Sequence, residues 1–327
     1  MMTLTRLLAT LVGVLFVAAL VIGPAGTGPV ASLRALILGD GGPLTLVMRE
    51  IRLPRALLAA MIGAALGLAG AAMQGFLRNP LADPGLIGVS GSAALGAVIA
   101  LQTGVATMTA FALPVSALAG ALIGVLLVLL LAGPRGGSLT LILAGIAISA
   151  LAGALTSLVL NLSPNPFAAN EIVFWMMGSL ADRSMTHVWI ALPLIVLGSA
   201  MLLSLGRGLD ALTLGEDAAQ AMGINLARLQ LTLILGTAAV VGASTAVAGA
   251  IGFIGLVVPH VLRGFVGARP GRLLPASALG GAVMLLAADI AVRMILPERN
   301  LKLGVLTALV GAPLFLHLIY RTRRAIA

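Results

Sequence analysis

Long apolar runs separated by short polar breaks dominate the pattern of hydrophobic and polar positions along this chain. Ten runs can be distinguished, with approximate bounds 7–23, 56–77, 86–105, 106–132, 139–161, 188–206, 229–248, 250–266, 273–295 and 303–320. Most are close to the roughly 20 apolar residues that an α-helix needs to cross a bilayer. The pattern predicts an all-α polytopic membrane protein with about ten transmembrane helices, forming a single domain over residues 1–327.

The breaks between the runs differ in strength. Most contain charged residues, glycine or proline, as at Arg78-Asn79-Pro80 and in the long segment 207–228. The boundaries at 105/106 and at 249 are the least marked, because only glycine and threonine interrupt the apolar pattern there.

Composition supports the membrane assignment. Hydrophobic residues make up 60% of the chain and charged residues only 9%, whereas soluble domains carry about 25% charged residues. A net charge of +9 would suggest nucleic acid in a soluble protein, but here the basic residues lie between apolar runs, as membrane topology requires. We expect membrane lipid around the chain and no nucleic-acid partner. There is no cysteine and the three histidines lie far apart, so no metal site is expected.

The basic residues also predict orientation. Ten crossings place both termini on one side, and cytoplasmic termini in the cell inner membrane put eleven Arg/Lys residues inside and eight outside, which agrees with the positive-inside rule. Seven of the eight exterior residues fall within 34–55 and 293–302. An acidic partner that docks from outside would explain this cluster, and contact with lipid headgroups is the alternative.

Small residues predict how the helices pack. Gly63 with Gly67, and Gly120 with Gly124, have the small-xxx-small spacing that lets membrane helices approach closely. Two weakly similar halves are also visible: residues 69–71 and Pro80 recur as residues 248–250 and Pro259. Internal repeats are common in transporters.

Few side chains could carry chemistry. The single lysine, Lys302, is not part of a phosphate-binding loop, so any ATP would be hydrolysed by another polypeptide, and we expect neither an enzyme nor a bound cofactor. Asp289 and Arg293 lie one helical turn apart and are predicted to pair. Gln74 is predicted to form a hydrogen bond between helices, and His260 to be hydrogen-bonded at a helix end.

The segment 207–228 is predicted to form two short amphipathic helices at the cytoplasmic face. Gly215 precedes Glu216 and Asp217 at a helix start, where acidic residues suit the helix dipole. Gly223 is placed to end that helix. Because helices that rest on lipid usually carry Lys or Arg on their polar face, the acidic residues favour a protein partner.

Together these motifs resemble the FecCD-type permeases, the transmembrane subunits of ABC importers for iron–siderophores, haem and vitamin B12. The resemblance covers essentially the whole chain. It rests on Arg52-Leu53-Pro54-Arg55, on Gln74 followed by residues 78–90, on 175–179, 214–223 and 249–260, on Ala288-Asp289 through Arg293, and on 311–315.

The resemblance implies a fold like that of the vitamin B12 importer permease, a homodimer, two ATP-binding cassette subunits that bind ATP and Mg at the cytoplasmic face, and a periplasmic or extracellular substrate-binding protein. It implies that helices 139–161 and 303–320 line the path. It assigns docking of the binding protein to Arg52, Arg55 and Arg293. It assigns ATPase coupling to Leu212, Leu214, Gly215, Glu216, Asp217, Ala218, Gln220, Met222 and Gly223. The remaining motif residues are expected to be structural: Gln74, Arg78, Asn79, Pro80, Asp83, Pro84, Pro259, His260 and Asp289.

The predicted function is therefore import of an iron chelate, either a siderophore complex or haem, by alternating access driven by a separate ATPase. The same importer carrying a corrinoid is the first alternative. An ion-coupled secondary transporter is the alternative from another class, and it would need several buried carboxylates where this sequence offers one.

Overall fold

Helices account for all regular structure in the part of the chain that the computed structural model describes, residues 2–23, 27–39, 41–133, 137–163, 166–295 and 301–326. In chain order they are α1 (Met2–Val21), α2 (Pro29–Leu38), α3 (Pro43–Leu46), the π-helix η1 (Val47–Arg52), α4 (Leu53–Phe76), the 3-10 helix η2 (Pro84–Ile87), α5 (Val89–Gln102), η3 (Val105–Thr107), α6 (Ala112–Ala132), α7 (Ser138–Asn161), α8 (Pro166–Met176), α9 (Met185–Ser204), α10 (Gly206–Leu212), α11 (Glu216–Ala221), α12 (Leu226–Ala248), α13 (Ile254–Arg263), η4 (Gly264–Val266), α14 (Pro270–Ile295) and α15 (Leu303–Ile326). The predicted all-α class is confirmed. Arg135 and Arg299, which entered the charge count, lie outside the described residues.

Each of the ten predicted spans coincides with one helix, namely α1, α4, α5, α6, α7, α9, α12, α13, α14 and α15. Within the described ranges, seven helices are long and apolar enough to cross a membrane. The two boundaries that the sequence marked least are both present. A short 3-10 turn separates α5 from α6, and Gly249, at φ 73°, ends α12.

The second span begins earlier than predicted. The run 56–77 predicts a helix that starts just after Arg52-Leu53-Pro54-Arg55, but a continuous apolar helix extends from Pro43 to Phe76. Pro54 lacks an N–H and cannot donate to the fourth residue before it. The chain accommodates it with the wide π turn η1, in which the Leu53 N–H bonds the Met48 carbonyl five residues back. Helices α2 and α8 were not predicted, because at 10 and 11 residues they are too short to read as membrane spans.

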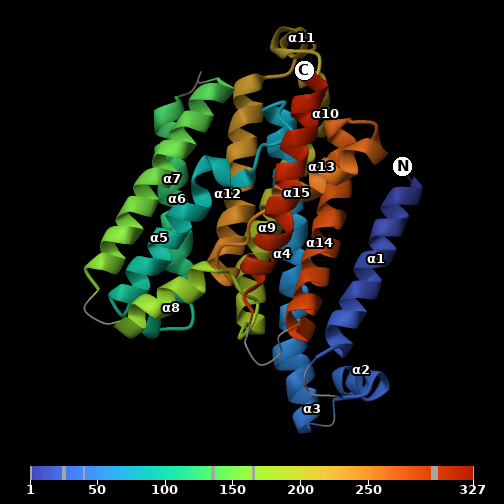
Figure 1. Cartoon of the computed structure of the whole chain (residues 1–327), viewed down its shortest axis with the longest axis vertical. Coiled ribbons are helices and arrows are strands. Elements are labelled where there is room, and N and C mark those ends of the chain that lie inside the picture. The colour runs from blue at the N-terminus through green and yellow to red at the C-terminus, as the bar shows by residue number, and fades with distance from the viewer. Residues whose placement is uncertain are drawn as a thin grey trace.

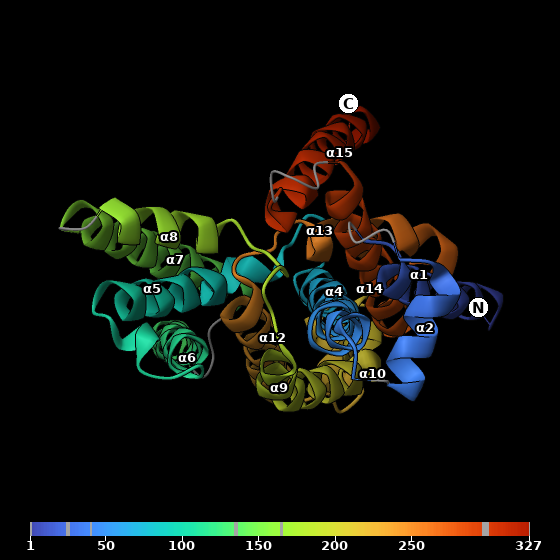
Figure 2. The same cartoon turned by 90° about the horizontal axis from the view of Figure 1, so that it is seen from below.

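The helices form one elongated bundle (Figure 1). Helices α2 and α3 lie at one end, here called the α3 end, and α11 projects at the other, the α11 end. The two chain ends both lie toward the α11 end. Helix α4 is central: most of its residues are buried, and it packs against α14, α13, α9 and α12. Seen along the bundle, α5 to α8 form one side, α1 and α14 lie on the other, and α15 stands apart (Figure 2).

Glycines set the closest helix contacts, as their spacing predicted. A Cβ on Gly63 would overlap the carbonyl oxygen of Gly281, so α4 and α14 touch backbone to backbone. Gly120 meets Ser92 in the same way where α6 crosses α5. Such close approach provides van der Waals packing where lipid leaves little hydrophobic driving force between helices.

The two predicted repeats take different backbone forms. Residues 69–71 lie inside continuous α4, whereas residues 248–250 span the end of α12 at Gly249. The broken helix pair α12 and α13 packs against α4. The second half therefore places irregular backbone in the interior of the bundle, where it needs hydrogen-bond partners.

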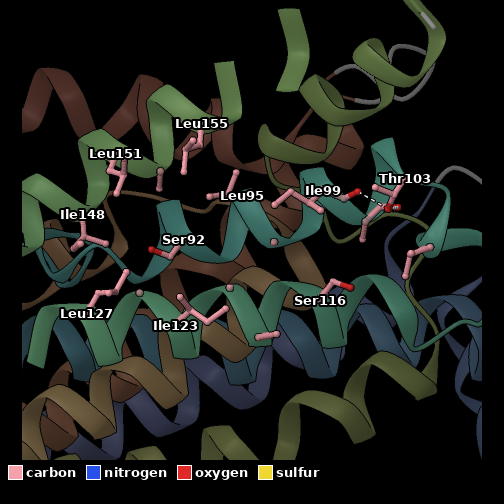
Figure 3. A pocket seen from close by; sticks show the side chains of 17 residues that line it. Ser92, Leu95, Ile99, Thr103, Ser116, Ile123, Leu127, Ile148, Leu151 and Leu155 are labelled. Atoms are coloured by element: carbon pink, nitrogen blue, oxygen red, sulfur yellow. Dashed lines mark hydrogen bonds between the residues drawn. The ribbon is translucent and has the colours of Figure 1, made fainter. Parts of the chain in front are cut away.

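An apolar cavity of about 360 Å³ lies between α5, α6 and α7 (Figure 3). Leucine and isoleucine side chains from the three helices point into it, together with Ser92, Thr103 and Ser116. The Thr103 hydroxyl donates to the Ile99 carbonyl of its own helix. No charged residue is among the described residues that line this cavity, so it is poorly suited to a charged ligand.

Candidate functional site

A cluster of arginines surrounds Asp289 near the α3 end. The carboxylate of Asp289 is fully buried. Arg293 pairs with it through Nη2 at 2.7 Å from Oδ2, which confirms the predicted pair. Arg55, from α4, binds the other oxygen through Nε at 2.8 Å. The sequence did not reveal this second partner, because Arg55 and Asp289 are 234 positions apart. A fork of two guanidinium groups on one carboxylate satisfies a buried charge that would otherwise be costly.

Arg52 and Arg293 also hold the end of α1. Nη1 of Arg52 donates to the carbonyls of Leu20 and Val21, each at 3.0 Å. Nη1 of Arg293 donates to the carbonyls of Ala19 and Ile22, at 2.8 and 3.0 Å. These are last-turn carbonyls, which have no partner inside the helix and carry its negative dipole end. The two arginines therefore act as a C-cap supplied by η1 and α14.

Arg49 makes the same kind of contact with α2. Its Nε and Nη2 donate to the carbonyl of Leu36 at 3.1 and 3.0 Å. The arginines that the sequence analysis expects outside the membrane thus have a use inside the subunit, beyond the partner docking and lipid contact that the sequence suggested. Arginine suits the task because its planar fork offers five donors and stays charged.

The predicted docking role has to be set against this geometry. Arg52 is only 4% exposed, and its Nη2 is buried without a partner among the described residues. The side chain of Arg293 is 7% exposed and that of Arg55 is 17% exposed. Arg55 is thus the most accessible of the three, and its docking role, like that of the others, stays a prediction.

A second polar cluster joins α4 to α13. Gln74 is buried, and its Nε2 donates to the carbonyls of Gly255 and Leu256 at 3.4 and 3.1 Å. In a helix the carbonyl of Gly255 would accept from residue 259, but Pro259 has no N–H to give. The Gln74 amide supplies that missing donor, which confirms the predicted hydrogen bond between helices. The Gln74 Oε1 in turn accepts from Nη2 of Arg263 at 2.9 Å.

His260 lies in the last turn of α13, as predicted. Its Nδ1 is buried and has no hydrogen-bond partner in the described structure, so that nitrogen does not make the predicted hydrogen bond. No group of three or more His, Asp or Glu side chains among the described residues could hold a metal ion.

The loop after α4 is stabilised by hydrogen bonds between its own side chains and nearby backbone N–H groups. Oδ1 of Asn79 accepts from the Leu81 N–H at 2.9 Å, and Oδ1 of Asp83 accepts from the Gly85 N–H at 2.7 Å and caps η2. Burial raises the pKa of the Asp83 carboxyl, and the bond from Gly85 acts in the opposite direction. A Cβ on Gly255 would lie 2.7 Å from the Pro84 ring, so this loop packs closely on the start of α13. The structural assignment of these motif residues is therefore consistent with their contacts.

The segment 207–228 forms the two short helices that its sequence predicted, α10 and α11. Gly215, at φ 105°, precedes α11, and Glu216 and Asp217 occupy its first turn. Gly223, at φ 83°, ends it, and the Ile224 N–H bonds the Ala219 carbonyl at 3.0 Å, as in a Schellman cap.

The residues of this segment differ in how far they are exposed to solvent. Leu212 is buried, at 3% exposed, whereas Leu214 and Met222 are 70% and 53% exposed. Exposed apolar residues beside acidic ones at the tip of a bundle are typical of an interaction surface. Arg78, held at φ 50°, reaches Glu216 at 3.8 Å. Because both side chains are half exposed, this pair contributes little stability.

Comparisons with known proteins agree with these features. A model of the FecCD transport family matches residues 11–321. The Fe(3+) dicitrate transport system permease protein FecD of Escherichia coli is 41% identical over 277 residues, covering 85% of this chain and 86% of that protein. The vitamin B12 import system permease protein BtuC of Citrobacter koseri is 39% identical over 276 residues, covering 84% and 83%. A solved inward-facing structure of a metal-chelate type ABC transporter has a TM-score of 0.87 at 34% identity and covers 98% of this chain and 100% of its own. The chain therefore belongs to the FecCD transport family and is a multi-pass permease of the ABC importer type.

Proposed function

We propose that this chain moves an iron chelate, a siderophore complex or haem, across the inner membrane as the permease of a binding-protein-dependent importer. It works by alternating access, with ATP and Mg bound by a separate ATPase. Residues 1–327 act as one permease domain, both termini are cytoplasmic, and the α11 end faces the cytoplasm. Import of a corrinoid by the same architecture is the second candidate.

One observation carries the proposal: two surfaces of different chemistry lie at opposite ends of the bundle. The α11 end presents an acidic helix with exposed Leu214 and Met222, which suits a soluble ATPase. At the α3 end Arg34 and Arg49 are exposed and Arg55 is partly exposed beside Asp289, and these basic groups suit acidic groups of a binding protein. A permease that receives cargo from a binding protein at one end and is driven by an ATPase at the other needs both surfaces.

Apolar surfaces support a path at a dimer axis. Helix α7 has three leucine or isoleucine side chains that are at least half exposed, Leu143, Ile146 and Leu158, and α15 has two such leucines, Leu309 and Leu316. A hollow of about 580 Å³ beside α15 is lined by residues such as Met176, Met177 and Pro313. An apolar surface of this kind would let cargo leave without binding tightly. We propose that two copies meet on this side, so that α7 and α15 line the path.

We rank iron chelates first because an iron dicitrate permease and a metal-chelate type transporter are among the relatives. Corrinoids remain the alternative, because the cobalamin import permease of Halobacterium salinarum is 41% identical to this chain, as is the iron dicitrate permease.

Reconstitution tests these assignments. The chain is purified with its ATPase and binding protein, placed in liposomes, and assayed for ATP-driven uptake of labelled ferric siderophore, haem and cobalamin. We expect uptake of an iron chelate that requires all components. Cobalamin uptake alone would replace the cargo assignment, and solute pumping by this chain alone on a proton or sodium gradient would overturn the whole proposal. The mass of the purified complex distinguishes two copies of this chain from one copy paired with a different permease.

A further inference from the structure

A hollow of about 480 Å³ lies beside α11 at the end of the bundle. Its walls come from the last residue of α4, the first turn of α7, the end of α10, α11, and the start of α12. We call it the α11 hollow. The proposed coupling surface on α11 is convex, whereas this feature is concave and directly adjoins it.

The lining of the α11 hollow combines buried or half-buried apolar side chains, here called its floor, with polar side chains. Phe76, Leu212 and Ile224 supply apolar surface, and Glu216, Gln220 and Gln230 supply polar groups. Glu216 is the one charged residue among the described lining residues. Its contact with Arg78 is long and exposed, at 3.8 Å, so the carboxylate can take another cation at little cost.

This chemistry fits a long basic side chain better than an apolar one. An arginine would bury its methylene stem against the floor, while its guanidinium meets the Glu216 carboxylate and the two glutamine amides. The aromatic ring of Phe76 adds a surface on which a guanidinium stacks well. An acyl chain would leave the carboxylate and the amides without partners.

We propose that the α11 hollow is a socket for an arginine side chain of the ATPase subunit, a second contact beside the exposed face of α11. This inference rests on the proposed function, since it requires a separate ATPase at this end. The position of the socket gives it a mechanical consequence. Gly137 and Ser138, at the start of α7, form part of its wall, so an inserted side chain would press directly on a helix proposed to line the path.

Filling the socket provides the first test. Gln230→Trp places a large ring in the hollow. Leu231→Trp is the matched control, because Leu231 is the next residue of α12, is 46% exposed and does not line the hollow. In lipid nanodiscs we expect Gln230→Trp to lower the affinity for the ATPase subunit about tenfold or more, the effect of losing an anchor side chain at an interface. Leu231→Trp should bind like the unmodified chain.

Chemical labelling provides a second test that does not depend on how a bulky variant folds. The chain contains no cysteine, so Gln230→Cys introduces a single thiol inside the hollow. We expect a small maleimide to label it in the permease alone and to be excluded once the ATPase subunit is bound. Scanning the arginines of the ATPase subunit to cysteine should then find one position that forms a disulfide with it.

The outcomes separate this inference from the proposed function. If the unmodified chain binds no ATPase subunit, the proposed function fails. If it binds, but Gln230→Trp binds equally well and the thiol of Gln230→Cys stays reactive in the complex, the importer assignment stands and the socket is refuted.

Discussion

The hydrogen bond from Gln74 to the Gly255 carbonyl leads to a quantitative prediction, because this carbonyl has no donor within its helix when residue 259 is proline. In Gln74→Met the side chain keeps its approximate volume but loses its amide, so the buried carbonyl of Gly255 loses the donor now 3.4 Å away and that of Leu256 the one 3.1 Å away. Leaving a buried acceptor without a partner costs about 1–3 kcal/mol. We expect Gln74→Met to lower the free energy of unfolding by about that amount.

The second arm of this experiment changes the background. In Pro259→Ala the new N–H can bond the Gly255 carbonyl within the helix, so the amide of Gln74 is needed less. Gln74→Met should then cost less than it does beside Pro259, by about 1 kcal/mol, a typical coupling between groups in contact. The bond from Arg263 to Gln74 is lost in both backgrounds and cancels in the comparison.

The assay is equilibrium unfolding in mixed micelles, with increasing sodium dodecyl sulfate and tryptophan fluorescence as the signal. The four chains, unmodified, two single variants and the double variant, form a closed cycle. An equal cost of Gln74→Met in both backgrounds would show that Gln74 does not compensate for Pro259. Uptake measured in parallel shows whether the same bond affects transport.

Three further predictions follow from the structure. Because Arg52 is buried on α1 carbonyls while Arg55 is the more exposed, Arg52→Ala should lower the thermal midpoint and leave binding-protein affinity at low salt unchanged. Arg55→Ala should lower the midpoint too, since it removes a partner of the buried Asp289, but it should also weaken binding-protein affinity; a loss of affinity in Arg52→Ala without a lower midpoint would reject the capping role. Gly281→Ala should destabilise the chain by about 1–3 kcal/mol through overlap with the α4 backbone, whereas Gly13→Ala, with nothing within 4 Å, should stabilise α1 slightly in the same unfolding assay. Burial raises the pKa of Asp83, so the folded chain holds the carboxyl proton more tightly than the unfolded chain does. The stability that this proton contributes is therefore full below the ordinary pKa of 3.8 and is lost as pH rises through the raised pKa. Asp83→Asn should flatten the pH profile of the thermal midpoint, and an unchanged profile would contradict the assignment.

Much of the fold could be predicted because membrane spans have a strong and simple signal. Ten apolar runs correspond to ten helices, and even the faint boundary at Gly249 is present. The short helices α2 and α8 escaped because their length matches no span. The start of the second span was misplaced because Pro54 suggests a helix start, and nothing in local sequence shows that a π turn can absorb it.

The candidate sites were predicted to different extents for a similar reason. Local signals identified the cap at Gly223 and the pair of Asp289 with Arg293, since both depend on residues close in the chain. The partner of Asp289 on α4 and the carbonyl partners of Arg52 depend on packing between distant helices. Such contacts have no periodicity and cannot be read from one sequence.

Several polar side chains of this chain share one physical task. Arg52 and Arg293 satisfy the end of α1, Arg49 the end of α2, and Gln74 the carbonyl that Pro259 leaves open. In lipid an open carbonyl has no water to bind, so interrupted helices need donors brought from neighbouring helices. A donor nitrogen that closes such a gap, such as Nη1 of Arg52 or of Arg293, can bind a partner only by giving up its carbonyl bonds. A partner carboxylate that bound these nitrogens would therefore compete with the cap on α1 and loosen α1 from α14. A spin-label distance between α1 and α14 that stays constant when the binding protein docks would show that the arginines keep their carbonyl bonds and that Arg55 serves the partner alone.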